Sequence, residues 1–152
     1  MSAAVAAQQG FDRQGEADDR ARLAAAMQGF VAGFGVTAAV HLEACVHCGA
    51  CADACPFQIA TGEAKYTPIH KLLPFRRAYL REAGAWAPLV RALGLVKAPT
   101  TGDLEQWQEL LYDSCTMCGR CTLACPMGID IADLIKSARH GMYKAGLVPD
   151  RL

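Results

Sequence analysis

All eight cysteines of this chain fall into two copies of one pattern. The first copy, C-x2-C-x2-C-x3-C followed by proline, covers residues 45–56, and the second covers residues 115–126. This spacing suits a [4Fe–4S] cluster, because two-residue gaps let one turning loop present three thiolates to one face of a cubane. Two runs predict two [4Fe–4S] clusters, and two clusters in one short chain predict electron transfer.

The two ligand sets are expected to cross. Where one chain holds two such clusters, the fourth cysteine of each run ligates the cluster of the other run. The first set is then Cys45, Cys48, Cys51 and Cys125, and the second set is Cys115, Cys118, Cys121 and Cys55. Such crossing would tie the two halves of the chain together through metal, so loss of either cluster should unfold more than its own loop.

Residues beside the cysteines fit this interpretation. Gly49 and Gly119 follow the second cysteine of each run, where glycine permits an unusual φ and a close approach of the backbone. His47 is expected to be an exposed loop residue and not a ligand, because no cysteine is missing from its run. An apolar cover that limits solvent near the clusters is expected from Ile59, Met127 and Ile129.

Two other uses of the cysteines are weighed against clusters. Four disulfides are typical of small secreted chains, yet the first ten residues lack the basic start of a signal peptide. Zinc can be bound by paired C-x2-C motifs, but zinc does not explain a third and fourth cysteine followed by proline, twice. No nucleophile–base set is visible, because Ser114 and Ser137 lack an identifiable partner.

Mostly helical elements are expected to position the two runs. The spacing of apolar residues predicts an amphipathic helix over 18–34 with Leu23, Met27, Phe30 and Phe34 on one stripe. Residues 36–42 are expected to form a short extended lead into the first loop.

Between the runs, Thr67 and Pro68 should start a helix that Pro74 kinks or divides and Gly84 ends. A short helix over 86–93, a loop over 99–102 and a helix over 103–112 should follow. Tyr79, Trp86 and Trp107 lie at helical positions and are expected in the core.

After the second run, Asp130 should cap a last helix that Gly146 stops. The fold class is therefore mainly α, an α-helical ferredoxin with a helical insertion of 59 residues between Cys55 and Cys115. We expect a flexible N-terminus over 1–17 and one α-helical dicluster domain over 18–152.

Composition limits the remaining classes. The chain has 152 residues, 53% of them hydrophobic, and a formal charge of zero, so no broad argument for nucleic-acid binding exists. Residues 56–97 carry seven basic and two acidic side chains, a net charge of +5, which indicates either a docking face or the solvated side of helices. The longest apolar stretch, residues 31–40, is shorter than the about 20 residues of a membrane span. A reducing, cytoplasmic location is expected.

The chain resembles a known family at its spacer and second run. The matching strings are Ala-Thr-Gly at 60–62, Lys-Tyr-Thr-Pro at 65–68, Tyr-Asp-Ser-Cys-Thr-Met-Cys-Gly-Arg-Cys at 112–121 and Pro-Met-Gly-Ile-Asp-Ile at 126–131. They are similar to the α-helical ferredoxin domain of heterodisulfide reductase C/D-type proteins and of DsrK, Hmc and Tmc-type redox complexes. The resemblance covers roughly residues 40–148. The cysteine runs alone are shared with succinate dehydrogenase iron–sulfur subunits and glycerol-3-phosphate dehydrogenase C-type proteins.

The resemblance implies an electron-transfer subunit of a larger redox complex. Its expected partner is a catalytic subunit with CCG domains, a flavoprotein, or a membrane haem or quinone subunit through which the chain could associate with a membrane. Unlike many family members, this chain contains no Cys-Cys-Gly and leaves no thiol spare, so no catalysis by the chain alone is expected. The alternative is the N-terminal part of a disulfide or quinone reductase whose active site lies on a partner chain. A DNA-binding sensor is disfavoured, because Pro74 and Pro88 interrupt the basic segment.

Overall fold

The computed structural model describes residues 16–33, 35–97, 99–144 and 146–148, and these residues form helices and no strands. The mainly α fold class is confirmed. The helices are α2 (Glu16–Gly33), α3 (Val36–Ala44), α4 (Pro56–Thr61), α5 (Pro68–Glu82), α6 (Ala87–Ala92), α7 (Thr101–Gln108), α8 (Arg120–Leu123) and α9 (Ile131–Lys144). A 3₁₀ turn, η1 (Ala64–Tyr66), and a π-helical turn, η2 (Glu109–Asp113), complete them. Of the segment expected to be flexible, residues 1–15 lie outside the described part.

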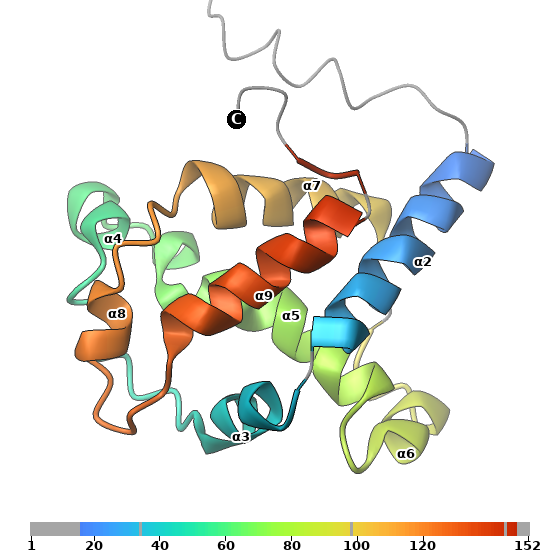
Figure 1. The fold of residues 1–152 in the computed structure, drawn as a ribbon, viewed down its shortest axis with the longest axis horizontal. Helices are drawn as coiled ribbons and strands as arrows, with labels where there is room; N and C mark the ends of the chain where they lie inside the picture. The colour runs from blue at the N-terminus through green and yellow to red at the C-terminus, as the bar shows by residue number, and fades with distance from the viewer. Residues whose placement is uncertain (1–15, 34, 98, 145, 149–152) are drawn as a thin grey trace, which may run out of the picture.

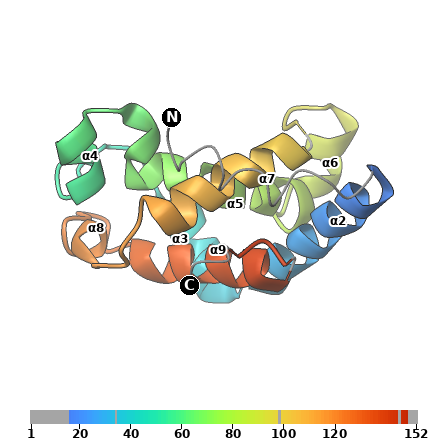
Figure 2. The same cartoon turned by 90° about the horizontal axis from the view of Figure 1, so that it is seen from above.

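The helices separate two ends of the molecule. In Figure 1, α9 crosses the centre in front of α5, and α2 packs against α9 at one end. The two cysteine loops lie at the other end, beside α4 and α8 (Figure 1). Figure 2 shows the same separation from above, with α4 and α8 opposite α2 and α6. The long helices α5 and α9 therefore connect the core to the cysteine loops.

An aromatic cluster fills the core between α2, α5 and α7. The centroid of the fully buried Phe30 ring lies 5.7 Å from that of Phe75 and 5.6 Å from that of Trp107. Tyr79 and Trp107 are buried as predicted. Trp86 is 73% exposed, so its predicted core position is wrong. It is the N-cap of the short α6, where Ala87 packs inward in its place.

Side-chain caps explain where the helices that carry the site begin. The Thr67 hydroxyl accepts a hydrogen bond from the His70 amide at 3.3 Å, and Pro68 occupies the first turn of α5, as predicted. Asp130 accepts from the Asp133 amide at 3.0 Å and starts α9. Each cap satisfies an amide that the first turn leaves without a partner inside the helix.

Three boundaries differ from the sequence-based expectation. Residues 36–44 form helix α3 and not an extended lead, because Ala38 and Leu42 are four residues apart and both are buried. Pro74 does not divide α5, which continues to Glu82 with Pro74 buried inside it. The helix expected over 103–112 begins two residues earlier, since Thr100 forms a capping box with Asp103, and its last turn is π-helical.

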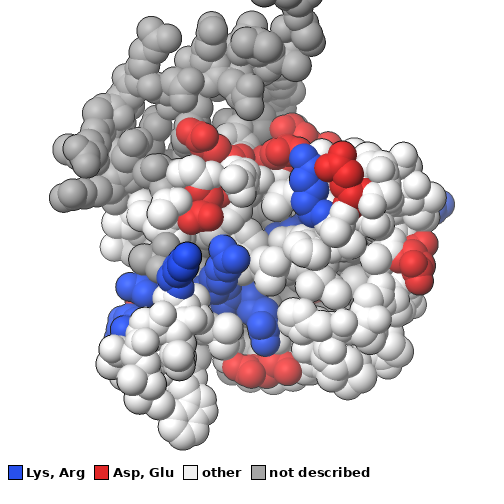
Figure 3. All heavy atoms as spheres, turned by 180° about the vertical axis from the view of Figure 1, so that it is seen from behind, with Lys and Arg blue, Asp and Glu red and all other residues white. Residues whose placement is uncertain are grey.

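Among the described residues, three of the seven basic side chains of the segment between the two runs form ion pairs. Lys65 pairs with Glu63 and Glu109, and Arg81 and Arg91 both pair with Glu82. Seen from behind, several basic side chains gather beside the lobe that α6 forms (Figure 3). No single helix in the described ranges is both long and apolar enough to cross a membrane. One pair of segments, Leu23–Ala32 and Val36–Ala44, together reaches that length and composition with a 95° bend between them.

Candidate iron–sulfur centres

The two cysteine loops repeat one backbone conformation. Gly49 and Gly119, after the second cysteine of each run, have φ of 86° and 73°. His47 and Met117, before that cysteine, have φ of 56° and 57°. Left-handed φ is readily adopted by glycine but costs other residues about 1–2 kcal/mol. The two loops therefore share the same unusual turn at equivalent positions.

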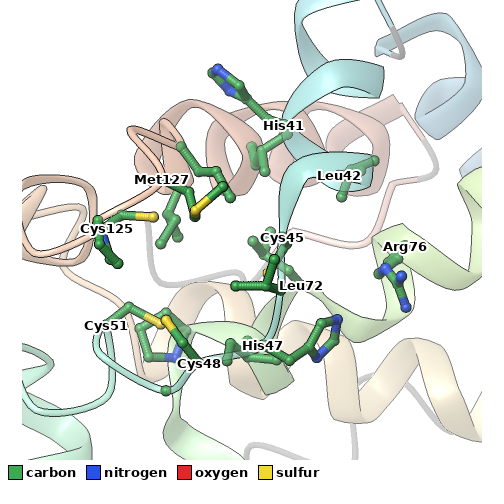
Figure 4. Close-up of a pocket in the computed structure, with 18 residues that line it drawn as sticks. His41, Leu42, Cys45, His47, Cys48, Cys51, Leu72, Arg76, Cys125 and Met127 are labelled. Carbon is green, nitrogen blue, oxygen red and sulfur yellow. The ribbon is translucent and has the colours of Figure 1, made fainter.

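The first hollow lies between the first loop, α3, α5 and the segment that leads into α9. Three thiols of the first run and one of the second line it, and they are Cys45, Cys48, Cys51 and Cys125. Figure 4 shows Cys48, Cys51 and Cys125 around one open space, with Cys45 beside Leu72. The other lining side chains are mostly apolar, including Ile129, Ile131 and Leu134.

The second hollow repeats this arrangement with the runs exchanged. Its four thiols are Cys55, Cys115, Cys118 and Cys121. Its walls come from α5 and α9 as well, through Lys71, Ala132 and Ile135. Each hollow therefore gathers the four cysteines that the crossing rule groups together, and four convergent thiols are the donor set that a [4Fe–4S] cluster requires.

Pro68 borders both hollows. This residue is almost fully buried at the start of α5. On α9, Ile131 and Leu134 face the first hollow while Ala132 and Ile135 face the second. The two hollows are thus separated by one wall of α5 and α9 side chains.

The exposed thiol of each run is its second cysteine. Cys51 and Cys55 are buried, whereas Cys48 and Cys118, the second cysteines of the two runs, are exposed. Burial raises the pKa of the Cys51 thiol, and the nearby Cys45, Cys125 and Cys48 act in the same direction. Burial also raises the pKa of Cys121 to about 11. Without iron these thiols stay protonated, so cluster binding must release protons.

The cysteines are not bonded to one another in the structure. All eight lie within the described residues, and none forms a disulfide. No group of three or more His, Cys, Asp or Glu side chains arranged around a single metal ion is found among the described residues.

The apolar cover is confirmed only in part. Ile129 is 3% exposed and lines the first hollow, and Met127 lines it at its edge. Ile59 is 64% exposed and lines neither hollow, so its expected role is wrong. Ile59 lies on α4, which turns outward after Cys55 because Pro56 begins a new helix there. His47 is exposed, as expected, although it borders the first hollow.

Lys71 is a feature of the second hollow that the sequence reasoning missed. Its side chain is 2% exposed, and its ammonium donates to the Cys55 sulfur at 3.6 Å and to the carbonyl oxygen of Ser114. It also lies 5.1 Å from the centroid of the Phe57 ring. The sequence signal for its burial was its position in the helix, because Lys71 falls on the same α5 face as Pro68, Leu72 and Phe75.

Arg139 is a second missed residue. It extends from α9, and its guanidinium donates to the carbonyl oxygens of Leu111, at 2.8 and 2.6 Å, and of Cys115. The Tyr112 hydroxyl donates back to the Arg139 carbonyl at 3.0 Å. Because the π-helical turn ends just before Cys115, its last carbonyls lack helical partners. Arg139 satisfies them and positions the start of the second cysteine run.

Lys65 and Tyr66, in the segment between the two cysteine runs, contact the turn that precedes the second run. The Tyr66 hydroxyl and the Lys65 ammonium both donate to Oε1 of Glu109, at 2.9 and 3.1 Å. Burial alone would raise the pKa of the Glu109 carboxyl, but these two bonds outweigh it and lower the pKa. Glu109 belongs to the turn before the second run, so this contact links the spacer to the start of that run.

Comparison with known proteins agrees with this architecture. A family model described as a 4Fe-4S dicluster domain matches residues 41–129. The chain belongs to this family of two-cluster iron–sulfur proteins and binds two [4Fe–4S] clusters. No solved structure matches the chain significantly.

Several curated proteins are similar to this chain. The Hdr-like menaquinol oxidoreductase iron-sulfur subunit of Archaeoglobus profundus is 32% identical over 108 residues, which are 71% of this chain and 19% of that protein. A subunit of the dihydromethanophenazine:CoB–CoM heterodisulfide reductase of Methanosarcina acetivorans is 31% identical over 111 residues, which are 72% of this chain and 26% of that protein. Lactate utilization protein B of Macrococcus caseolyticus is 32% identical over 96 residues, 63% of this chain and 16% of that protein.

These comparisons confirm the resemblance to heterodisulfide reductase-type iron–sulfur proteins. The chain spans 19–26% of the length of the first relatives it matches, so what those whole proteins do is not thereby shown for this chain.

Proposed function

We propose that this chain is an electron-transfer domain that relays single electrons between its two [4Fe–4S] clusters within a larger redox complex. One cluster is held by Cys45, Cys48, Cys51 and Cys125, and the other by Cys115, Cys118, Cys121 and Cys55. The clusters supply the one-electron chemistry, and the chain supplies distance, burial and hydrogen bonds.

The shared wall is the observation that carries this proposal. Electron tunnelling falls off steeply with distance, and one residue, Pro68, borders both hollows, the only one of the described residues to do so. Cys48 and Cys118 are exposed on opposite sides of that wall, so each cluster has an edge that a partner can approach. The chain thus provides separate places for an electron to enter and to leave.

The expected partners follow from the relatives' names. Those names include a menaquinol oxidoreductase and a heterodisulfide reductase. We infer a catalytic subunit with CCG domains, a flavoprotein or a membrane quinone or haem subunit as partner, with this chain on the cytoplasmic side. The alternative is a share in the active site of a disulfide or quinone reductase. Turnover of a dithiol or a quinone by the isolated, cluster-loaded chain would favour that alternative.

Anaerobic reconstitution tests the relay. About eight irons per chain and two reducible EPR signals are expected. Fewer irons, or no reducible signal, would overturn the proposal.

Single-cysteine variants test the crossing of the ligands. If the sets cross, Cys55→Ala removes or alters the same EPR signal as Cys118→Ala and leaves the signal that Cys48→Ala affects. A Cys55→Ala spectrum that matches Cys48→Ala instead would show that each run holds its own cluster.

A further inference from the structure

Charge is distributed unequally between the two hollows. Lys71 is buried in the wall of the second hollow, where its ammonium lies 3.6 Å from the Cys55 sulfur. The first hollow is bordered by Arg76, five residues further along α5, but Arg76 has no hydrogen bond to a cysteine sulfur among the described residues. Of the two cations that α5 presents to the hollows, only Lys71 contacts a thiol.

The contacts of Lys71 fix its ammonium in place. The carbonyl oxygen of Ser114 accepts one of its hydrogen bonds, and the ring of Phe57 lies 5.1 Å away. No acidic side chain pairs with Lys71 among the described residues. A buried cation without a carboxylate partner is costly unless another negative group compensates it. The sulfur of Cys55 is the acceptor in position to supply that charge.

We propose that Lys71 makes the cluster of the second hollow the higher-potential centre, so that it is the preferred resting place of the electron. The proposal rests on the relay and on the ligand sets proposed above. Reduction adds one negative charge to a cluster, and a fixed positive charge in a low-dielectric wall stabilises that charge more than water would. A hydrogen bond to a ligand sulfur acts in the same direction.

Arg76 makes no comparable contact with a thiol of the first hollow. Its side chain is half-buried at the edge of the first hollow, and its Nε has no hydrogen-bond partner in the described part of the chain. A cation that is partly solvated is screened, so its influence on a nearby charge is smaller. Electrons that enter at the first hollow should therefore move toward the second.

The first experiment uses the unmodified, cluster-loaded chain. An EPR-monitored redox titration gives the potentials of both clusters, and the signal that Cys118→Ser removes or alters belongs to the second hollow. We expect that signal to have the higher potential. The opposite order would overturn the inference, whereas absence of a second reducible cluster would instead refute the proposed function.

The second experiment changes Lys71 itself. Lys71→Met has a side chain of similar length but carries neither a charge nor a hydrogen-bond donor. We expect the equilibrium constant for sharing one electron between the clusters to shift at least tenfold toward the first cluster. For a one-electron couple that is about 59 mV. The control is Arg77→Met, which removes an exposed charge from the same helix and should leave the equilibrium constant for electron sharing unchanged.

Other outcomes are equally decisive. Equal shifts of both potentials, or no shift in a fully loaded Lys71→Met protein, would refute the role of Lys71. If Lys71→Met fails to load the second cluster, Lys71→Gln keeps a donor for the Ser114 carbonyl, and the order of potentials in the unmodified chain still decides the inference.

Discussion

Replacing Gly141 with alanine tests the close crossing of α2 and α9. A Cβ built on Gly141 lies 2.4 Å from Cδ1 and 2.8 Å from Cε1 of Phe30, and 3.0 Å from its backbone nitrogen. The ring cannot swing aside, because Phe30 is fully buried against Phe75 and Trp107. Gly29 marks the same contact, since its built Cβ lies 2.9 Å from the Gly141 Cα. The two helices must therefore move apart to accommodate the methyl group.

Two opposing effects set the expected change in the free energy of unfolding of Gly141→Ala. Alanine is favoured over glycine inside a helix by about 0.5–1 kcal/mol, so helix propensity alone predicts a more stable variant. Overpacking a tight core costs about 1–3 kcal/mol, and three Phe30 atoms within reach place Gly141→Ala near the upper end. The expected net loss in free energy of unfolding is about 2–2.5 kcal/mol, which lowers Tm by about 4–10 °C for a chain of this length.

Anaerobic denaturant unfolding of the cluster-loaded protein, followed by far-UV circular dichroism, measures this loss. Gly84→Ala is the matched control, because its built Cβ lies 3.5 Å from the nearest atom and stability should change by less than about 0.5 kcal/mol. Iron content should not change, since Gly141 lines neither hollow. A Gly141→Ala protein as stable as its parent, or more stable, would refute the tight crossing.

The remaining predictions concern the core, a cap and the second loop. Trp107→Ala should lower the free energy of unfolding by about 3–5 kcal/mol, whereas Trp86→Ala, at an exposed site, should change it by less than about 0.5 kcal/mol in the same denaturant assay. Thr100→Ala removes the capping box of α7 and should lower the free energy of unfolding by about 1 kcal/mol, while Thr100→Ser should keep most of that stability. Equal Tm values for the two variants would contradict this prediction. Arg139→Gln should speed iron loss to a chelator from one cluster only, with Arg120→Gln unchanged, and uniform loss from both clusters would argue against its positioning role.

Local patterns in the sequence predicted most of what the site contains. The cysteine spacing identified the thiols that meet in each hollow, and Thr67, Pro68 and Asp130 marked two helix starts correctly. These features depend on neighbours a few residues away, so they can be read without knowing the fold. The ligation itself remains a prediction.

Tertiary contacts decided the rest. Lys71 carries the charge of an ordinary surface residue, and only the packing of α5 against the second hollow buries it. Arg139 binds carbonyls 24 and 28 residues away, a partnership that no local pattern encodes. Trp86 was misplaced for the opposite reason, because the chain turns between α5 and α6 and leaves its ring outside.

The single wall between the two hollows also limits how many electrons the domain stores. Because Pro68 touches both hollows, a negative charge added on one side lies close to the other, and little water intervenes to screen the repulsion. The first electron should therefore make the second harder to add, so the two reductions are anticooperative. Such a domain would accept its two electrons one at a time, at two separate potentials. A partner that performs two-electron chemistry would have to collect its electrons in two successive transfers.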